Sequence, residues 1–151
     1  MNYIAIDPGL KGGYALCYGN GKTAAYPMPV IGGDIDISEI ALEFEGIADV
    51  VVFIEKVHSM PKQGVASMFK FGMGYGKLIG MCQAMEWQYH LVTPQEWKKY
   101  VLKGTEKDKA AAIRVASRLY PKMNLIAPGC RKEHDGMADA MCILYYGMNY
   151  R

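Results

Sequence analysis

Short apolar runs separated by glycine-rich turns open the chain. Residues 3–6, 14–18 and 23–28 each have the composition of a strand, and the segments between them contain several glycines. Strands joined by such short turns pair antiparallel. The pattern therefore predicts a three-stranded antiparallel meander whose first strand ends at Asp7.

The hydrophobic period then changes. Apolar side chains recur at helical spacing between residues 37 and 47, with Ser38 near the start of the predicted helix. Residues 50–54 are continuously apolar and mostly β-branched, which is typical of a strand buried on both faces. This strand ends at Glu55.

The second half alternates long helical patterns with one more strand. Thr93-Pro94-Gln95-Glu96 has the residues of a helix start, with a capping threonine, a proline in the first turn and a glutamate three residues after the cap. The remaining elements are a loop at 58–63, a helix at 64–87, a strand at 89–92, and helices to about 102, at 105–119 and at 134–146. This order predicts an α/β fold with a mixed five-stranded sheet, three antiparallel strands followed by parallel ones, and helices on both faces.

The composition is that of a globular protein. The chain has 151 residues, of which 51% are hydrophobic and 21% charged, and we expect one domain over residues 1–151. No apolar run is long enough to cross a bilayer and no signal peptide is evident, so we expect a soluble, cytoplasmic protein without a membrane partner. Four scattered cysteines favour reduced thiols over a zinc site or disulfides.

Charge is distributed unevenly. Residues 1–55 contain two basic and eight acidic residues, whereas residues 56–151 contain fifteen basic and seven acidic ones. Such asymmetry suits a polyanion partner for the second part, but taken alone it is better explained by helices that carry solvated Lys and Arg.

Four carboxylates lie where a site is expected. Asp7 and Glu55 end two strands, and if these strands are parallel neighbours, both side chains emerge at the edge where open α/β sheets bind ligands. Asp135 and Asp139 are four residues apart on one helical face. No cationic partner is evident beside them, and hard oxygen ligands select Mg²⁺ or Mn²⁺. Two such ions can clamp the attacking and leaving oxygens of a phosphodiester displacement.

Each acid also has an ordinary structural interpretation. An aspartate before Pro-Gly often forms an Asx-turn, as Asp7 could, and Asp135 could simply complement a helix dipole. Glu55 is the hardest to explain this way, because a carboxylate at the end of a fully apolar strand is costly without a partner.

The chain resembles the RuvC family of Holliday-junction resolvases, and more closely its phage-encoded branch. The resemblance rests on IDPGLKGGYAL, VVFIEKVHSMPKQGVASMFKFGMGYGKLIG, VTPQEWKK and HDGMADAMCILYYG, which occur in this order. It implies an RNase H-like fold and a crossover junction endodeoxyribonuclease that nicks branched DNA symmetrically as a homodimer, leaving 5′-phosphate ends. The implied roles are recombination or the debranching of DNA during replication and packaging, in the cytoplasm of a bacterium or of a phage-infected host, without a nucleotide cofactor.

The resemblance also assigns the acids. Asp7, Glu55, Asp135 and Asp139 match the family's four metal ligands and catalytic acids. We expect two Mg²⁺ or Mn²⁺ ions per site, with Asp7 bridging them. Phage relatives often have Glu at the position of Asp139. Some relatives have a histidine after the acidic pair, whereas His134 precedes it here.

Cellular members carry an aromatic wedge in the loop after the glutamate strand. Here that loop reads HSMPKQ and has no Phe or Tyr. His58 and Met60 are the candidates for stacking on DNA bases.

The helix at 64–87 contains glycines at positions that cost helix stability. Gly72, Gly76 and Gly80 recur every four residues and form a smooth stripe beside Met68. This stripe suits either close docking on the protein's own sheet or a two-fold helix–helix contact. The family resemblance favours the dimer.

Basic residues crowd the helices after the last strand and flank the glutamate strand. Side chains of Lys and Arg position DNA through its phosphates without reading sequence. The candidates for DNA contact are Lys62, Lys70, Lys77, Lys103, Lys107, Lys109 and Arg114, together with His58, and Lys98, Lys99 and Arg118 lie in the same basic helices.

Three other functions remain open. The same acids suit a ribonuclease H that cuts the RNA strand of a hybrid, and the basic surface suits a non-catalytic module that binds branched DNA. An Asp-x-Gly turn also occurs in sugar kinases and actin-like nucleotide-binding proteins, but 151 residues accommodate only one lobe of such a fold.

Overall fold

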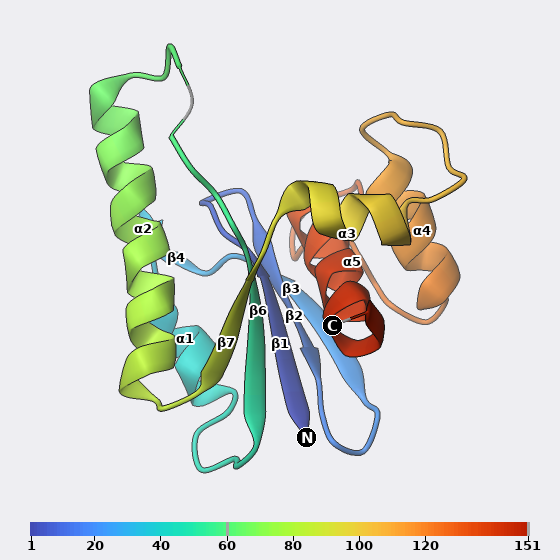
Figure 1. The fold of residues 1–151 in the computed structure, drawn as a ribbon, viewed down its shortest axis with the longest axis horizontal. Helices are drawn as coiled ribbons and strands as arrows, with labels where there is room; N and C mark the ends of the chain where they lie inside the picture. The colour runs from blue at the N-terminus through green and yellow to red at the C-terminus, as the bar shows by residue number, and fades with distance from the viewer. Residues whose placement is uncertain (60, 151) are drawn as a thin grey trace.

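A five-stranded sheet forms the centre of the protein, in a computed structural model that describes residues 1–59 and 61–150 (Figure 1). The strand order is β3-β2-β1-β6-β7. β1 (Asn2–Asp7), β2 (Gly13–Cys17) and β3 (Thr23–Pro27) form an antiparallel meander, and β6 (Val50–Glu55) and β7 (Gln88–Val92) run parallel to β1. The mixed sheet predicted from the sequence is confirmed.

Helices cover both faces of this sheet, as predicted. α1 (Ile37–Leu42) and α2 (Val65–Ala84) lie on one face, and α3 (Pro94–Val101), α4 (Ala111–Leu119) and α5 (Asp135–Tyr150) lie on the other (Figure 1). No helix in the part of the chain that the structure describes has the length and apolarity that crossing a membrane requires.

Side chains of β1 alternate between the two faces. Ile4 and Ile6 belong to the core beneath α1 and α2, whereas Ala5 belongs to the core beneath α5. Successive strand side chains point to opposite faces. The sheet therefore separates two hydrophobic cores, and each strand contributes to both.

The predicted capping of α3 is present in full. The Thr93 hydroxyl accepts a hydrogen bond from the backbone N–H of Glu96, and the Glu96 carboxylate accepts one from the backbone N–H of Thr93 at 2.7 Å. This reciprocal pair satisfies two donors that the first turn leaves without helical partners. The direction in which the chain leaves β7 is thereby set.

The sequence analysis missed a small hairpin. No strand was predicted between residues 28 and 37, but β4 (Val30–Ile31) and β5 (Asp34–Ile35) pair antiparallel. Gly32 and Gly33 have φ of 58° and 79°, the conformation of the tight turns that connect hairpin strands. Strands of two residues are too short to show a hydrophobic period, which is why the pattern did not reveal them.

Helix boundaries also differ from the expected ones. α1 begins after Asp36, whose side chain accepts a hydrogen bond from the backbone N–H of Ser38, and it ends at Leu42, before the predicted end at 47. α5 extends to Tyr150, four residues beyond its predicted end. All four cysteines are unpaired.

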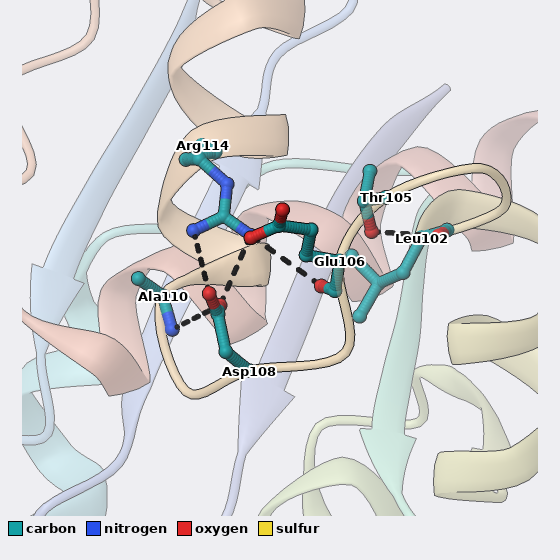
Figure 2. Close-up of polar contacts among 6 residues, drawn as sticks. All are labelled: Leu102, Thr105, Glu106, Asp108, Ala110 and Arg114. Carbon is teal, nitrogen blue, oxygen red and sulfur yellow. Dashed lines mark hydrogen bonds and ion pairs between the residues drawn. The ribbon is translucent and has the colours of Figure 1, made fainter.

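α4 begins later than predicted because Asp108 organises the chain before it. Figure 2 shows the Asp108 carboxylate accepting hydrogen bonds from the Ala110 backbone N–H at 3.0 Å and from the Arg114 guanidinium at 3.0 and 3.2 Å. Aspartate side chains that bond nearby backbone groups favour turns over helix. Residues 105–110, expected to be helical, therefore form a turn-rich loop that carries Lys107 and Lys109.

α5 approaches the sheet so closely that side chains are excluded at the contact. A Cβ on Gly136 would lie 2.4 Å from the backbone carbonyl carbon of Gly12, in the turn between β1 and β2. At the other end of α5, a Cβ on Gly147 would lie 2.3 Å from the ring of Phe53. The absence of both Cβ atoms lets this helix pack directly on the strands.

We expect Gly136→Ala to destabilise the protein by about 1–3 kcal/mol, because backbone rather than a flexible side chain stands in the way of the new methyl group. Chemical denaturation followed by circular dichroism measures this. Gly19→Ala is the matched control, because a Cβ there would make only ordinary contacts of 3.5 Å or more, so its stability should change by less than about 0.5 kcal/mol. Equal stability of the two variants would contradict the packing argument.

Candidate active site

Asp7 and Glu55 lie side by side at the carboxyl ends of neighbouring strands. Ile6 and Ile54 are partners in the parallel pairing of β1 with β6, and each acid is the next residue along its strand. The alternation of side chains places both acids on the face covered by α3, α4 and α5, because Ala5 and Phe53 belong to that core. The expected meeting of these two strand ends is confirmed.

α5 brings the second pair of acids to the same edge. Asp135 is exposed in the first turn of this helix and Asp139 is half-buried one turn later. His134 precedes the helix, and its Nδ1 accepts a hydrogen bond from the backbone N–H of Met137 at 3.2 Å. His134 thus satisfies one of the free donors at the helix start, which is a structural role.

The acids interact electrostatically. Removal from water, with smaller contributions from the negative charges of Asp139 and Glu55, raises the pKa of Asp7 to about 8. Burial likewise raises the pKa of Asp139 to about 6, with contributions from Glu55 and Asp135 in the same direction. The four predicted residues therefore share one strongly negative environment, in which at least one carboxyl holds a proton at neutral pH.

Lys98 is a cation near the acids, contrary to the expectation that no cationic partner lies beside them. The positive charge of Lys98, on α3, lowers the pKa of both Asp7 and Asp139, against the raising effects of burial and of the other acids. The Lys98 amine also lies over the Trp97 ring, 5.1 Å from its centroid. The sequence placed Lys98 only among the basic helices, because its proximity to β1 depends on how α3 crosses the sheet.

Trp97 holds Glu55 in place, and the sequence analysis did not single it out. The indole N–H donates a hydrogen bond to the Glu55 carboxylate at 2.6 Å, and the Trp97 side chain is fully buried. A buried indole N–H requires an acceptor, so the tryptophan of the TPQEW segment was the available signal. This bond orients one of the two oxygens of Glu55.

The donor chemistry of the acids suits a hard divalent cation, but the side chains do not form a closed site. Among residues 1–59 and 61–150, no three His, Cys, Asp or Glu side chains converge closely enough to hold one metal ion. The mutual repulsion of Asp7, Glu55 and Asp139 is what a divalent cation would relieve. Metal binding at these acids stays a prediction.

Several hollows surround the acids. A cavity of about 240 Å³ is lined by Trp97, Lys109, Asp135 and Asp139, among others. A second, of about 370 Å³, is lined by Glu55, His58, Met68 and Phe71 together with neighbouring residues. A third, of about 520 Å³, adjoins Asp7 and lies beneath α2. The acids thus border open space on both sides of the strand ends.

The predicted DNA-contacting residues fall into two groups. Lys103 and Lys107 line one hollow of about 670 Å³ together with Lys98 and Lys99. Lys109 lines the smaller cavity of Asp135 and Asp139. Lys70 lines the cavity beside Asp7, and Lys62 is exposed in the loop before α2.

Two of the predicted basic residues already have acidic partners. The Lys77 amine lies 3.8 Å from the Asp34 carboxylate, and Arg114 is held by Asp108 (Figure 2). Both pairs are partly exposed, and such pairs contribute little stability. Contact of Lys77 and Arg114 with DNA stays a prediction.

The glycine stripe of α2 does not dock on the protein's own sheet. A Cβ added at Gly72, Gly76 or Gly80 would meet nothing within 4 Å. Gly74, between them, is the buried glycine of this helix, and its Cβ would lie 3.1 Å from Ile35. The intramolecular docking alternative is therefore wrong for the stripe.

Of the two candidates for stacking on bases, His58 lines the cavity beside Glu55, and Met60 lies outside the described residues.

The fold has counterparts among solved structures. The structure of Thermus thermophilus RuvC matches with a TM-score of 0.59 and 15% identity, over 98% of this chain and 96% of that one. T. thermophilus RuvC in complex with a Holliday junction substrate matches with a TM-score of 0.69 and 13% identity, over 99% and 94%. No protein-family profile and no curated protein sequence matches. The chain therefore has a RuvC-like fold of the RNase H-like α/β class, as the resemblance implied.

The raised pKa values predict how stability depends on pH when no divalent ion is bound. Asp7 and Asp139 hold protons in the folded state that they release in the unfolded state at the same pH. Their contribution to folding is present below a pH of about 3.8 and is lost as the pH rises through about 6 for Asp139 and about 8 for Asp7.

In EDTA, we therefore expect the midpoint of thermal unfolding to fall between pH 5 and pH 8.5. Asp7→Asn should reduce this fall and be more stable than the wild type at pH 8.5. Glu45→Gln, at an exposed position in the turn after α1, is the control and should follow the wild-type curve. A wild-type midpoint that rises over this interval would contradict the electrostatic account of the site.

Proposed function

We propose that this protein is a metal-dependent endonuclease that nicks Holliday junctions and other branched DNA. The observation that carries the proposal is the group of electrostatically coupled carboxyls, two at strand ends and two on α5, at the edge of a RuvC-like fold. One of the matching RuvC structures is a complex with a Holliday junction substrate. Recombination, or the debranching of replicated or packaged phage DNA in a bacterial cytoplasm, is the proposed setting.

Asp7, Glu55, Asp135 and Asp139 are the residues that would hold Mg²⁺ or Mn²⁺, two per site. When bound, such ions lower the pKa of a water and stabilise the oxygen that leaves phosphorus. Trp97 keeps Glu55 oriented through its indole hydrogen bond. Lys98 offsets part of the negative charge that would otherwise repel the DNA backbone.

Recognition of branched DNA would use the basic surface around the acids. Lys103 and Lys107 share one hollow beside α3, and Lys109 lines the cavity of Asp135 and Asp139. Amines placed beside the acids can hold a phosphate backbone in register without reading sequence. This arrangement suits a substrate recognised by its shape.

A homodimer would place two such sites on one junction. Val65, Phe69, Gly72, Gly76 and Gly80 recur every three or four residues and so share one face of α2. Val65 and Phe69 are 87% and 75% exposed, and nothing covers the three glycines. Large apolar side chains next to a smooth stripe support close packing against a second copy of the helix.

We expect Asp7→Asn to abolish cleavage of a four-way DNA junction while junction binding survives or tightens, because a negative charge is removed beside the phosphates. Asp139→Asn should act in the same way, and EDTA should stop the wild type. His134→Ala is the contrasting variant. It should lower stability by about 1 kcal/mol through the lost helix cap, and it should reduce cleavage less than Asp7→Asn or Asp139→Asn does. A junction-cleavage gel shows each result, and the nicks should carry 5′-phosphates.

The same assay separates the alternatives. Preferential cutting of an RNA–DNA hybrid would identify a ribonuclease H, and binding without cleavage at any divalent ion concentration would identify a non-catalytic module. Full cleavage by Asp7→Asn would contradict the proposed catalytic role of the four acids.

We expect junction affinity to fall steeply with salt, because Lys and Arg displace counterions from phosphates. Replacing both Lys107 and Lys109 with Ala should lower the slope of log affinity against log salt by about 2 per subunit if both contact phosphate. Lys22→Ala, in the turn between β2 and β3 at the opposite end of the sheet, should leave the slope unchanged. Fluorescence anisotropy in EDTA measures the slope, and equal slopes for wild type and double variant would assign these lysines to the solvated surface.

We expect the wild type to be a dimer in solution and Gly76→Leu to be a monomer, because leucine at this position faces open space in one subunit and blocks close approach of a second. Ala66→Leu, exposed on α2 but outside the stripe, should remain dimeric. Light scattering at tens of micromolar distinguishes these states. A monomeric wild type would refute the proposed dimer.

A further inference from the structure

The Glu55 carboxylate is held by a donor that lies 42 positions further along the chain. The Trp97 indole N–H donates a hydrogen bond to Oε2 of Glu55 at 2.6 Å. The Trp97 side chain is fully buried and Glu55 is half-buried, so water does not compete for the N–H. A buried indole N–H that loses its acceptor costs free energy, which keeps this bond formed. The bond therefore fixes the rotation of the carboxylate as well as its place at the end of β6.

The position of the indole is set by the strand beside Glu55. Glu55 of β6 pairs with Val92, the last residue of β7. The next residue, Thr93, caps α3, and the backbone N–H of Trp97 donates to the Thr93 carbonyl at 3.3 Å. The ring packs in the core beneath α5, and the Lys98 amine lies over it, 5.1 Å from the ring centroid. Donor and acceptor are thus linked through one strand pairing and one helix turn, with no long loop between them.

The indole engages one of the two carboxylate oxygens of Glu55. Among residues 1–59 and 61–150, the Trp97 bond to Oε2 is the hydrogen bond that this carboxylate makes, and no ion pair joins it. Glu55 also lines the cavity of about 370 Å³ described above. An oxygen that accepts a short hydrogen bond from a fixed donor has less charge to offer a cation than an oxygen without one. Glu55 is therefore prepared to bind a cation through Oε1 alone.

Cations differ in how they use a carboxylate. Mg²⁺ requires near-ideal octahedral geometry, keeps several waters and takes few carboxylates. Mn²⁺ also accepts octahedral oxygen sites. Ca²⁺ takes roughly six to eight oxygens in a flexible arrangement, and carboxylates that bind it through both oxygens help to supply them. A glutamate restricted to one oxygen therefore suits Mg²⁺ and Mn²⁺ better than Ca²⁺.

We propose that Trp97 is a positioning residue that restricts Glu55 to binding through one oxygen, and that this restriction makes the group of acids prefer Mg²⁺ or Mn²⁺ to Ca²⁺. The four acids supply negative charge, which attracts any divalent cation and does not distinguish among them. Trp97 supplies the distinction, because it engages an oxygen that the larger ion would use. This inference rests on the proposed function, and it gives α3 a part in selecting the cation.

The test compares the cation affinities of the wild type and Trp97→Phe without DNA. Phenylalanine retains an aromatic ring and offers no N–H. Free Mn²⁺ is measured by electron paramagnetic resonance, and Mg²⁺ or Ca²⁺ is added as a competitor. We expect Trp97→Phe to bind Mg²⁺ and Mn²⁺ about tenfold more weakly, the effect of losing a hydrogen bond that orients a metal ligand. Ca²⁺ should lose much less affinity, because the released carboxylate can offer it both oxygens.

The ratio of Mg²⁺ affinity to Ca²⁺ affinity is the decisive quantity. A merely structural role of Trp97 would weaken the binding of all the cations by the same factor, which would overturn the proposal, as would unchanged affinities. Trp87→Phe is the matched control, because Trp87 is a buried tryptophan in the opposite core, beneath α1 and α2. Its cation affinities and their ratio should equal those of the wild type.

A second measurement uses the wild type and decides the question even if Trp97→Phe does not fold. The chain has two tryptophans, so a proton–nitrogen correlation spectrum contains two indole signals, and Trp87→Phe identifies that of Trp97. With saturating Mg²⁺, the Trp97 N–H should keep the downfield shift of a hydrogen-bonded indole. Loss of this shift would show that the cation displaces the indole from Glu55, and it would overturn the proposal.

Failure of this inference and failure of the proposed function have different signatures. A wild type that binds Ca²⁺ as tightly as Mg²⁺, yet cuts a four-way junction in Mg²⁺, would overturn the inference and leave the proposed function intact. A wild type that prefers Mg²⁺ through Trp97 but cuts no branched DNA would instead refute the proposed function.

Discussion

The close approach of α5 to the turn between β1 and β2 is the contact on which the candidate site depends. Gly136 and Gly12 pack backbone against backbone, with no space for a single methyl group. Asp135 precedes this contact directly and Asp139 follows it by one turn. Any side chain at Gly136 would push the start of α5 away from the strand ends, and the distance between the two pairs of acids would grow.

Repulsion among the carboxyls of the site opposes folding, and packing elsewhere in the protein must outweigh it. Asp7 and Asp139 are partly removed from water close to two other carboxyls, and burial is the main cause of their raised pKa values. Lys98 offsets only part of this charge, because the net shift of both groups is still upward. Two cores, one on each side of the sheet, supply the stability that lets such a group of acids persist. Destabilised acidic groups of this kind are typical of functional sites.

α2 presents three different surfaces to three different surroundings. Gly74, Leu78 and Met81 pack inward beneath the sheet, the stripe of Gly72, Gly76 and Gly80 faces open space, and Phe71 lines the cavity beside Glu55. A single helix therefore contributes to the core, to the proposed subunit contact and to a cavity beside Glu55. Its low amphipathic contrast in the sequence follows from this division, since apolar residues are needed on more than one face.

The sequence alone was sufficient to predict the sheet with helices on both faces and the strand ends and helix face on which the four acids lie. The glycine-rich turns, the apolar run before Glu55 and the helical spacing of Asp135 and Asp139 depend on interactions between residues near one another in the chain, so they are visible as local patterns. Local patterns also predicted the capping of α3. They failed for β4 and β5, which are too short to show a period, and for the start of α4, where Asp108 bonds the nearby backbone and Arg114.

Only the tertiary structure decided which residues surround the acids. The hydrogen bond from Trp97 to Glu55 spans 42 positions in the chain, and the influence of Lys98 on Asp7 crosses from α3 to β1. It likewise decided that the glycine stripe of α2 faces outward while Gly74 faces Ile35, which composition could not distinguish. Such contacts depend on the angles at which helices cross the sheet, and these angles follow from the packing of the whole core rather than from any segment of the sequence.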